Sequence, residues 1–158
     1  MRRPWNIIDS PVYSLATYAD GKLNMNICTY VTAISMKPKQ YAIAIYDNTK
    51  TLANLEVNST CILQLLHHNQ LGLVRKLGKQ SGINIDKQAW LDKHEHLDYW
   101  QDYAVLKGAC AYLKLELIKR VDTGGDHQLF CFQSTQYNTV CEQDVLMFQD
   151  LVEAKVIL

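Results

Sequence analysis

Hydrophobic residues along this chain fall mostly into short runs whose length and spacing are typical of β-strands. Strands are predicted over residues 12–18, 27–35, 41–46, 61–66, 109–118 and 128–134. The run at 109–118 has the clearest alternation, with an apolar face made by every second residue, namely Ala109, Ala111, Leu113, Leu115 and Leu117. A last short strand is predicted over residues 151–157.

Turns and two short helices are predicted between these strands. The pairs Asp20-Gly21 and Gly124-Gly125 are typical turn sequences. One helix is expected over residues 51–57, with Asn48 or Thr49 as its N-cap, and a second over 70–77, before Gly78. Residues 85–103 show no clear period and are interpreted as a loop with some helix. The pattern predicts a mainly β fold, a closed or nearly closed antiparallel barrel with short helices, in a single domain over residues 1–158.

Composition and charge narrow the functions open to such a fold. The chain has 158 residues, of which 48% are hydrophobic, so it can bury a sizeable core. Sixteen basic and sixteen acidic side chains give a formal net charge of zero, which argues against nucleic-acid or anionic-membrane partners. The longest apolar runs are far shorter than the ~20 residues that span a bilayer. Polar residues and Pro4 interrupt the N-terminal segment, so no signal-peptide core is predicted and a cytoplasmic protein is expected.

The cysteine and histidine positions do not predict a metal centre. The chain has five cysteines, which are Cys28, Cys61, Cys110, Cys131 and Cys141. They lie at least ten positions apart, so most are expected to be reduced, buried and structural. The histidine pairs at 67–68 and 94–96 have no third ligand at metal spacing, and no metal site is predicted.

Two polar segments are candidate sites. Residues 24–35 (NMNICTYVTAIS) carry amide and hydroxyl side chains along a strand, and residues 47–51 (DNTKT) stand at an expected helix start. Backbone N–H groups, hydroxyls and a lysine at a helix N-terminus can bind a phosphate, although a helix cap plus a turn is the simpler explanation. Residues 123–127 (TGGDH) place His127 after a glycine pair, and here a hairpin turn is the simpler explanation.

In their order and spacing, these segments resemble the flavin reductase-like family, whose fold is an FMN-binding split barrel. Residues 24–35 are similar to the family's N-G-M-T-x-S-W-x-x-P-x-S stretch, and residues 125–127 reproduce its G-D-H tripeptide. Residues 11–17 resemble its opening strand, and residues 106–109 (LKGA) resemble the entry to its long middle strand. Ser81-Gly82 with Asp86-Lys87 resembles its S-G-x-x-x-D-K stretch. The resemblance covers residues 11–134.

The chain departs from the family pattern at several positions. Met25 replaces a glycine, Ile27 a threonine and Ala33 a proline, and Gln64 stands where an asparagine is usual. Asp47 places a carboxylate beside the expected phosphate, which is unfavourable unless that side chain turns away. The resemblance therefore implies a flavin site that is altered in detail.

The resemblance implies a six-stranded antiparallel split β-barrel that forms a homodimer with FMN near the subunit interface. It implies hydride transfer from NAD(P)H to bound FMN and onward electron transfer, with His127 as the catalytic residue that positions the donor. The backbone of residues 28–32 would bracket the flavin ring, and residues 48–51 would hold the phosphate. The implied cofactor-binding residues are Asn24, Cys28, Thr29, Tyr30, Val31, Thr32, Asn48, Thr49, Lys50 and Thr51.

Two other functions stay open from the sequence. One is an FMN-binding electron carrier that has no pyridine-nucleotide site. The other is a split-barrel binding module that has lost flavin altogether. Reduction of bound FMN by NAD(P)H separates the reductase from the carrier, and a protein that takes up no added FMN would be the module that has lost flavin.

Overall fold

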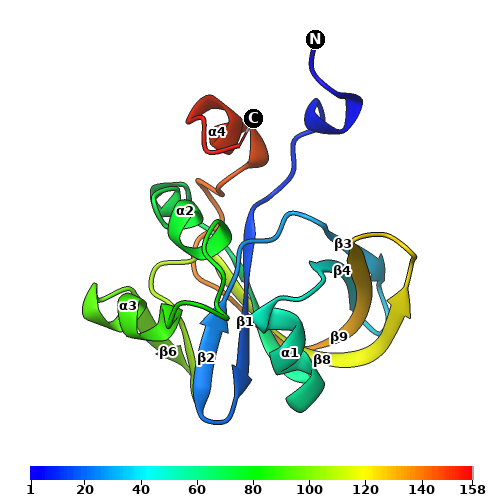
Figure 1. The fold of residues 1–158 in the computed structure, drawn as a ribbon, viewed down its shortest axis with the longest axis vertical. Helices are drawn as coiled ribbons and strands as arrows, with labels where there is room; N and C mark the ends of the chain where they lie inside the picture. The colour runs from blue at the N-terminus through cyan, green and yellow to red at the C-terminus, as the bar shows by residue number, and fades with distance from the viewer. Residues whose placement is uncertain (158) are drawn as a thin grey trace.

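The computed structural model describes residues 1–157 and is built around one seven-stranded antiparallel sheet (Figure 1). The strand order is β2-β1-β5-β8-β9-β4-β3, and β6 and β7 form a separate hairpin. The strands are β1 (Tyr13–Ala19), β2 (Lys22–Met25), β3 (Val31–Ser35), β4 (Gln40–Tyr46), β5 (Thr60–Leu65), β6 (Leu97–Trp100), β7 (Tyr103–Leu106), β8 (Ala111–Asp122) and β9 (His127–Thr139). This confirms the mainly β antiparallel fold, with one more strand in the sheet than the six expected.

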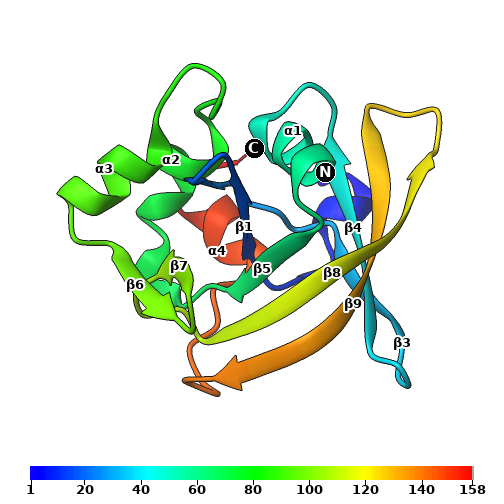
Figure 2. The same ribbon diagram turned by 90° about the horizontal axis from the view of Figure 1, so that it is seen from below.

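Four short helices flank the sheet. They are α1 (Lys50–Val57), α2 (Leu73–Gly78), α3 (Lys87–Lys93) and α4 (Phe148–Glu153). The helix α1 packs on β1, and α3 packs on β2. Figure 2 shows the long β8–β9 hairpin crossing the molecule, with its turn end beside α1, where Arg120 of β8 donates to Glu56 of α1 at 2.9 Å. Among the described residues, no helix has both the length and the apolar character needed to cross a membrane.

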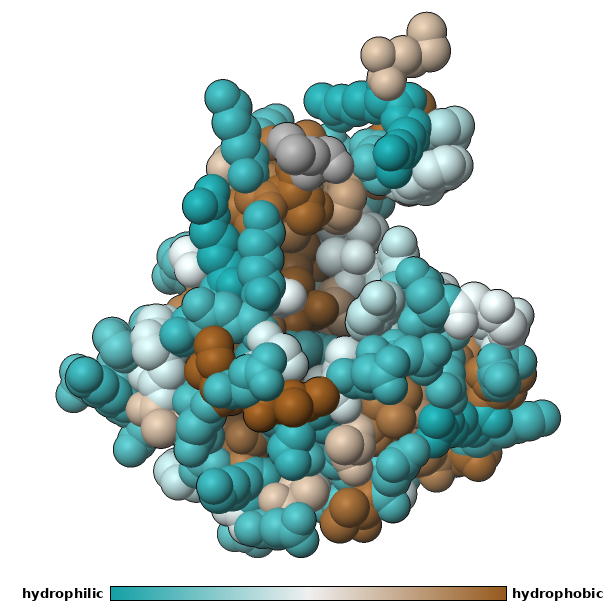
Figure 3. Space-filling model, viewed as in Figure 1, coloured by the Kyte–Doolittle hydropathy of each residue, from teal (hydrophilic) through white to brown (hydrophobic). Residues whose placement is uncertain are grey.

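The central strands are buried on both faces because the sheet separates two hydrophobic clusters. On β1, Leu15 belongs to one cluster and its neighbour Ala16 to the other. On β5, Leu63 and Ile62 divide in the same way, and these side chains are fully buried. Alternate side chains of a strand point to opposite faces, so a strand that is buried on both faces needs a continuous run of apolar residues. Figure 3 shows further hydrophobic side chains gathered between α2, α4 and the N-terminal segment.

The predicted strand over residues 27–35 was too long. The backbone N–H and C=O of Cys28 both bond to Tyr13 of β1, at 2.8 and 2.9 Å. Two residues later, the carbonyl of Tyr30 accepts from Ala44 of β4 at 3.0 Å. The chain therefore crosses from one part of the sheet to the other here, and β3 begins only at Val31. The short strand β2 precedes this crossover and was not predicted.

The structure also differs from the predictions in two further segments, residues 85–103 and 151–157. Residues 151–157 are not a strand, because the carboxylate of Asp150 accepts from the N–H of Met147 and so caps α4. Residues 85–103 hold both α3 and β6 rather than a loop with some helix. Helix α3 begins where the Asp86 carboxylate accepts from the N–H of Ala89 at 2.9 Å. Both helix starts depend on a carboxylate cap rather than on apolar periodicity.

Candidate functional site

A cavity of about 530 Å³ opens between the 26–30 crossover, the start of α1 and the segment after α2. Its volume lies within the ~300–1,000 Å³ typical of small-molecule sites. His127 lines it, and so do most of the expected cofactor-binding residues, namely Asn24, Cys28, Thr29, Tyr30, Asn48, Thr49, Lys50 and Thr51. The other two, Val31 and Thr32, stand on β3 outside the lining. The cavity therefore joins residues that are about one hundred positions apart in sequence.

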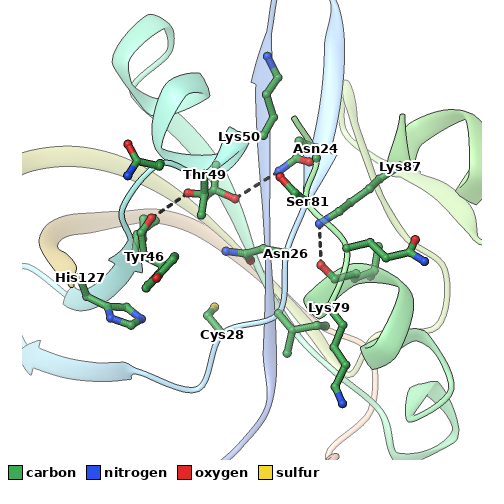
Figure 4. Close-up of a pocket in the computed structure, with 18 of the residues that line it drawn as sticks. Asn24, Asn26, Cys28, Tyr46, Thr49, Lys50, Lys79, Ser81, Lys87 and His127 are labelled. Atoms are coloured by element: carbon green, nitrogen blue, oxygen red, sulfur yellow. Dashed lines mark hydrogen bonds between the residues drawn. The ribbon is translucent and has the colours of Figure 1, made fainter. Parts of the chain in front are cut away.

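Figure 4 shows how these side chains surround the cavity. His127 and Tyr46 lie on one side, and Lys87 and Ser81 lie on the other. Cys28 lies between the two groups, on the crossover that follows β2. The arrangement leaves a polar wall near α1 and a less polar floor formed by Ile27, Cys28, Ala44, Ile45 and Leu77.

The charges around the cavity are all of one sign. Three lysines line it, which are Lys50, Lys79 and Lys87, and His127 adds a titratable ring. None of the described residues that line it is an aspartate or a glutamate, although the whole chain has as many acidic as basic side chains. A neighbouring cavity of about 430 Å³ differs, because it carries Asp47, Glu56 and only one basic side chain, Arg120. The larger cavity is therefore suited to an anion.

The start of α1 contributes a further positive region. Thr49 is the N-cap, and its hydroxyl accepts from the N–H of Leu52 at 3.3 Å and donates to the carbonyl of Tyr46 at 3.0 Å. The first N–H groups of a helix have no partner within the helix, so they favour negative charge at this end. In Figure 4 the side chain of Lys50 extends away from Cys28, toward the outside of this region. The cap prediction for Thr49 is confirmed.

Asp47 does not place a carboxylate in the main cavity. Its Oδ1 accepts from Gln128 Nε2 at 2.8 Å, and the residue lines the neighbouring cavity instead. The side chain is therefore turned away, as a phosphate at the start of α1 would require.

Two hydrogen-bonded residues hold β2 against α1. Thr51 is buried, and its hydroxyl accepts from Asn24 Nδ2 at 3.2 Å. Gly82 packs against Asn24 and the start of α1. A Cβ at this position would lie 2.0 Å from Asn24 Oδ1 and 3.0 Å from the Cβ of Lys50. Any side chain at this position would force Asn24 or the start of α1 to move. Next to it, Gln80 Oε1 is buried without a hydrogen-bond partner among the described residues, which leaves an unused acceptor on the cavity wall.

Lys87 places a cation inside the protein. The side chain is 5% exposed, and its Nζ donates to the carbonyls of Leu77 at 2.6 Å and Met25 at 2.9 Å. Burial lowers the pKa of this amine to about 8. The lysine therefore connects β2, α2 and α3 while it lines the cavity.

His127 lies at the mouth of the cavity with two tyrosines. It opens β9 opposite Tyr46 of β4, and its ring centroid is 5.2 Å from that of Tyr46 and 5.3 Å from that of Tyr30. Its Nδ1 is 2.7 Å from Asp126 Oδ1. A carboxylate at this distance favours a proton on Nδ1, which leaves Nε2 as the ring atom available to a ligand.

Sequence reasoning missed several lining residues, which are Asn26, Tyr46, Lys79, Gln80, Ser81, Gly82 and Lys87. A signal was present for part of this set, because residues 81–87 resemble the S-G-x-x-x-D-K stretch without having been given a role. Two departures from the family pattern lie outside the lining. Met25 is fully buried, and Gln64 is buried between Ser14 Oγ, Met25 Sδ and the N–H of Leu106. Met25 and Gln64 are therefore part of the packed interior rather than of the cavity wall.

In residues 1–157, no group of three or more His, Cys, Asp or Glu side chains is arranged to hold a metal ion. All five cysteines are free, and Cys28, Cys61 and Cys110 are buried.

Comparison with known proteins agrees with the fold. The model of the flavin reductase like domain family matches residues 1–152. A similar solved structure is an FMN-binding protein from Thermus thermophilus, with a TM-score of 0.75 and 20% identity over 88% of this chain and 75% of that chain. The styrene monooxygenase flavin reductase from Pseudomonas putida S12 has a TM-score of 0.76 and 18% identity over 91% of this chain and 88% of that chain.

A third similar structure is the flavin reductase component of a bacterial two-component tryptophan halogenase. Its TM-score is 0.79, with 14% identity over 92% of this chain and 89% of that chain. At these identities the likeness establishes the fold, a split barrel. No curated protein matches the chain.

Proposed function

The chain belongs to the flavin reductase-like family, and we propose that it is an oxidoreductase that binds FMN and uses NAD(P)H as electron donor. When bound, the flavin would supply the redox chemistry, which is to accept a hydride and pass electrons onward. The protein's part is to bind the flavin, to orient the donor and to set the local charge.

The main support for this proposal is that all the charged side chains lining the main cavity are basic, and that the cavity lies at the start of a helix. Lys50, Lys79 and Lys87 line it without a carboxylate among the described lining residues, next to the first turn of α1. A phosphate group gains from cations and from a helix N-terminus together. This favours a phosphorylated flavin over riboflavin. The solved FMN-binding protein with the same fold supports this choice of ligand class.

The less polar floor suits a flat aromatic ring. Cys28 is the central residue of this floor, and its backbone N–H and C=O are already bonded to Tyr13. In the proposed site, therefore, the side chain of Cys28 and the adjacent Thr29 contact the ring rather than the Cys28 backbone. Burial raises the pKa of the Cys28 thiol to about 12, so the residue presents a neutral, weakly polar surface.

His127 is proposed to position the nicotinamide at the mouth of the cavity. Tyr30 and Tyr46 fix the ring from two directions, and Asp126 holds Nδ1. Nε2 is then free to accept or donate a hydrogen bond at a fixed place, which is what orientation of a donor requires.

A homodimer is proposed for the assembled protein. β3 is the last strand of the sheet, and it exposes Ile34, with a second exposed hydrophobic residue, Met36, directly after it. An edge strand presents unpaired backbone N–H and C=O groups that another chain can bind, and exposed apolar side chains beside it favour such a contact. A second copy over β3 would lie close to Tyr30 and so to the cavity mouth.

Anaerobic reduction of bound flavin tests the proposal. Purified protein is titrated with FMN, and NADH or NADPH is then added in a stopped-flow spectrometer while the visible flavin band is recorded. We expect saturable FMN binding and loss of the band with at least one of the two donors. Bound FMN that neither donor bleaches would instead identify an electron carrier. Failure to bind FMN would identify a binding module without flavin.

A further inference from the structure

Two cysteines meet at the end of the β8–β9 hairpin that lies away from the Gly124-Gly125 turn. The carbonyl oxygen of Cys110 accepts from the N–H of Val140 at 2.8 Å and from the N–H of Cys141 at 3.0 Å. With standard backbone dimensions, the second bond keeps the Cα atoms of the two cysteines within about 7 Å, which is the upper limit for a disulfide. Figure 2 shows the start of β8 and the end of β9 side by side at this end of the hairpin.

The two thiols also point to the same place. Cys110 Sγ lies 3.6 Å from the carbonyl oxygen of Gln143, and Cys141 Sγ lies 3.3 Å from the same oxygen. Burial raises the pKa of the Cys110 thiol, and the neighbouring Cys141 raises it further through its charge and through a hydrogen bond between the two thiols. The two sulfur atoms therefore lie around the same carbonyl oxygen, and both cysteines are free.

The two thiols differ in access to solvent. Cys110 is fully buried, whereas Cys141 is partly exposed. An exposed thiol next to a buried one is the arrangement of a reacting cysteine and a resolving cysteine. Neither residue lines the flavin cavity, so the pair is a separate feature of the molecule.

We propose that Cys110 and Cys141 form a reversible redox site that hydrogen peroxide oxidises to a disulfide. The Cys141 thiol first loses its proton to solvent, and the thiolate attacks one oxygen of the peroxide. The O–O bond breaks, a sulfenic acid forms, and the departing hydroxide takes up the released proton to give water. The Cys110 thiol then attacks the Cys141 sulfur, and its proton leaves with the hydroxyl group as a second water. Two thiols and one peroxide thus give one disulfide and two waters, and a thiol reductant reverses the reaction.

The cross-link would close a loop that contains the whole of β8 and β9. It would also fix the start of the following segment, whose Leu146 accepts from the N–H of Val12 at 2.8 Å and donates to the carbonyl of Leu66 at 2.9 Å. That segment joins the hairpin to β1 and β5. Oxidation would therefore stabilise the link between the sheet and α4.

The supply of peroxide rests on the proposed function, because a reduced flavin that meets dioxygen yields hydrogen peroxide. The cysteine site itself does not rest on it. Added peroxide and enzymatically supplied peroxide can therefore be tested separately.

Oxidation of the purified full chain tests the site. Protein is exposed to a small molar excess of hydrogen peroxide, denatured, and analysed by thiol titration and non-reducing peptide mass spectrometry. We expect the titratable thiols to fall from five to three, a cross-linked peptide that joins Cys110 to Cys141, and full recovery with dithiothreitol. In a Cys110→Ser variant, dimedone should label Cys141 several-fold more than in the parent. A Cys131→Ser variant, which removes another partly exposed cysteine, should still lose two thiols.

Several outcomes would overturn the site. They are a thiol count that stays at five, a cross-link between other cysteines, or oxidation of Cys141 beyond sulfenic acid without a bond to Cys110. A second reaction supplies NADH and FMN in air instead of peroxide, with and without catalase. A disulfide that forms with added peroxide but not in this reaction would leave the site standing and count against the proposed function.

Discussion

Lys87 combines a buried position with two main-chain acceptors. Its pKa is lowered to about 8 from an ordinary value of 10.5 because burial disfavours the charged amine. Between these two pH values the unfolded chain binds more protons at this residue than the folded chain. The free energy of unfolding should therefore rise with pH from about 8 toward 10.5. The pH dependence of stability therefore reports on Lys87, a residue of the cavity wall.

A Lys87→Met variant should lose this rise. One proton changes the free energy of unfolding by at most ~1.4 kcal/mol per pH unit, so the parent's slope should exceed that of the variant by less than this amount. Urea unfolding followed by tryptophan fluorescence at several pH values between 7 and 10 measures it. Lys93→Met removes an exposed lysine from the same helix and should keep the parent's slope. Equal slopes in the Lys87→Met variant and the parent would contradict the environment described for Lys87.

His127 should affect the reaction more than the binding of flavin. Loss of its ring removes the contact with Asp126 at the mouth of the cavity, but it leaves the Thr49 cap at the start of α1 intact. Because misplacing a donor by about 1 Å can cost on the order of a hundredfold in rate, His127→Ala should slow anaerobic flavin reduction by roughly that factor with little change in the dissociation constant for FMN.

His68→Ala is a suitable control for this substitution, since His68 is exposed and does not line the cavity. A His127→Ala variant that binds FMN and is reduced as fast as the parent would leave His127 as an ordinary hairpin residue.

The segment between α2 and α3 fits against α1 through Gly82. An added methyl group there would meet Asn24 Oδ1 at 2.0 Å, and Asn24 is held by its bond to Thr51. Overpacking of this kind costs about 1–3 kcal/mol. Gly82→Ala should therefore lower the stability by that amount and also weaken FMN binding, because the cavity wall must move.

Gly72→Ala is the matched control for this wall, because a Cβ at Gly72 meets nothing within 4 Å. Its effect on stability should stay within about 0.5 kcal/mol. Thermal unfolding and FMN titration of both variants measure the difference. Similar behaviour of the two glycine variants would show that the segment yields easily and does not shape the site.

β3 should act as the dimer contact. A charge at Ile34, which is 50% exposed on this edge strand, would oppose burial under a second copy. Ile34→Glu should therefore shift the protein from dimer to monomer in sedimentation velocity. Ile118→Glu is the control, since Ile118 is 51% exposed on β8. A parent that sediments as a monomer, or an Ile34→Glu variant that stays dimeric, would contradict the proposed interface.

The sequence predicts the elements that carry a local signal, including the short helices α1 and α2, and misses those without one. The alternation in β8 and the apolar runs of β4 and β5 are local signals, and so is the cap at Thr49. In contrast, β2 has four residues, and its pairing with β1 depends on the Asp20-Gly21 turn. The crossover at Cys28 follows from backbone bonds of Cys28 to Tyr13 and of Tyr30 to Ala44, which no local pattern can indicate.

The candidate site divides in the same way. The residues at the start of α1 could be predicted because they are adjacent in sequence and carry a recognisable pattern. Gln80 carried no such pattern. Lys87 lies in the S-G-x-x-x-D-K resemblance, but its place on the wall depends on its bonds to the carbonyls of Met25 and Leu77, which no local pattern indicates. The exclusion of Asp47 from the main cavity likewise depends on its bond to Gln128, 81 positions away.

At the scale of the whole molecule, charge is distributed unevenly although the total is zero. The main cavity collects three lysines, while Asp47 and Glu56 face the neighbouring cavity. A phosphate in the main cavity should therefore contribute much of the affinity for FMN, and salt should weaken that contribution by screening. Riboflavin has the same ring without the phosphate, so the difference in affinity between FMN and riboflavin measures the contribution of the phosphate.

The most direct measurement is a flavin fluorescence titration of the purified protein with FMN and with riboflavin, at low and at high salt. We predict that FMN binds at least about tenfold more tightly than riboflavin at low salt, a difference of ~1.4 kcal/mol. We further predict that added salt reduces this difference while the affinity for riboflavin changes little. Equal affinities for the two flavins at low salt, or an FMN affinity that does not respond to salt, would contradict a phosphate site in this cavity.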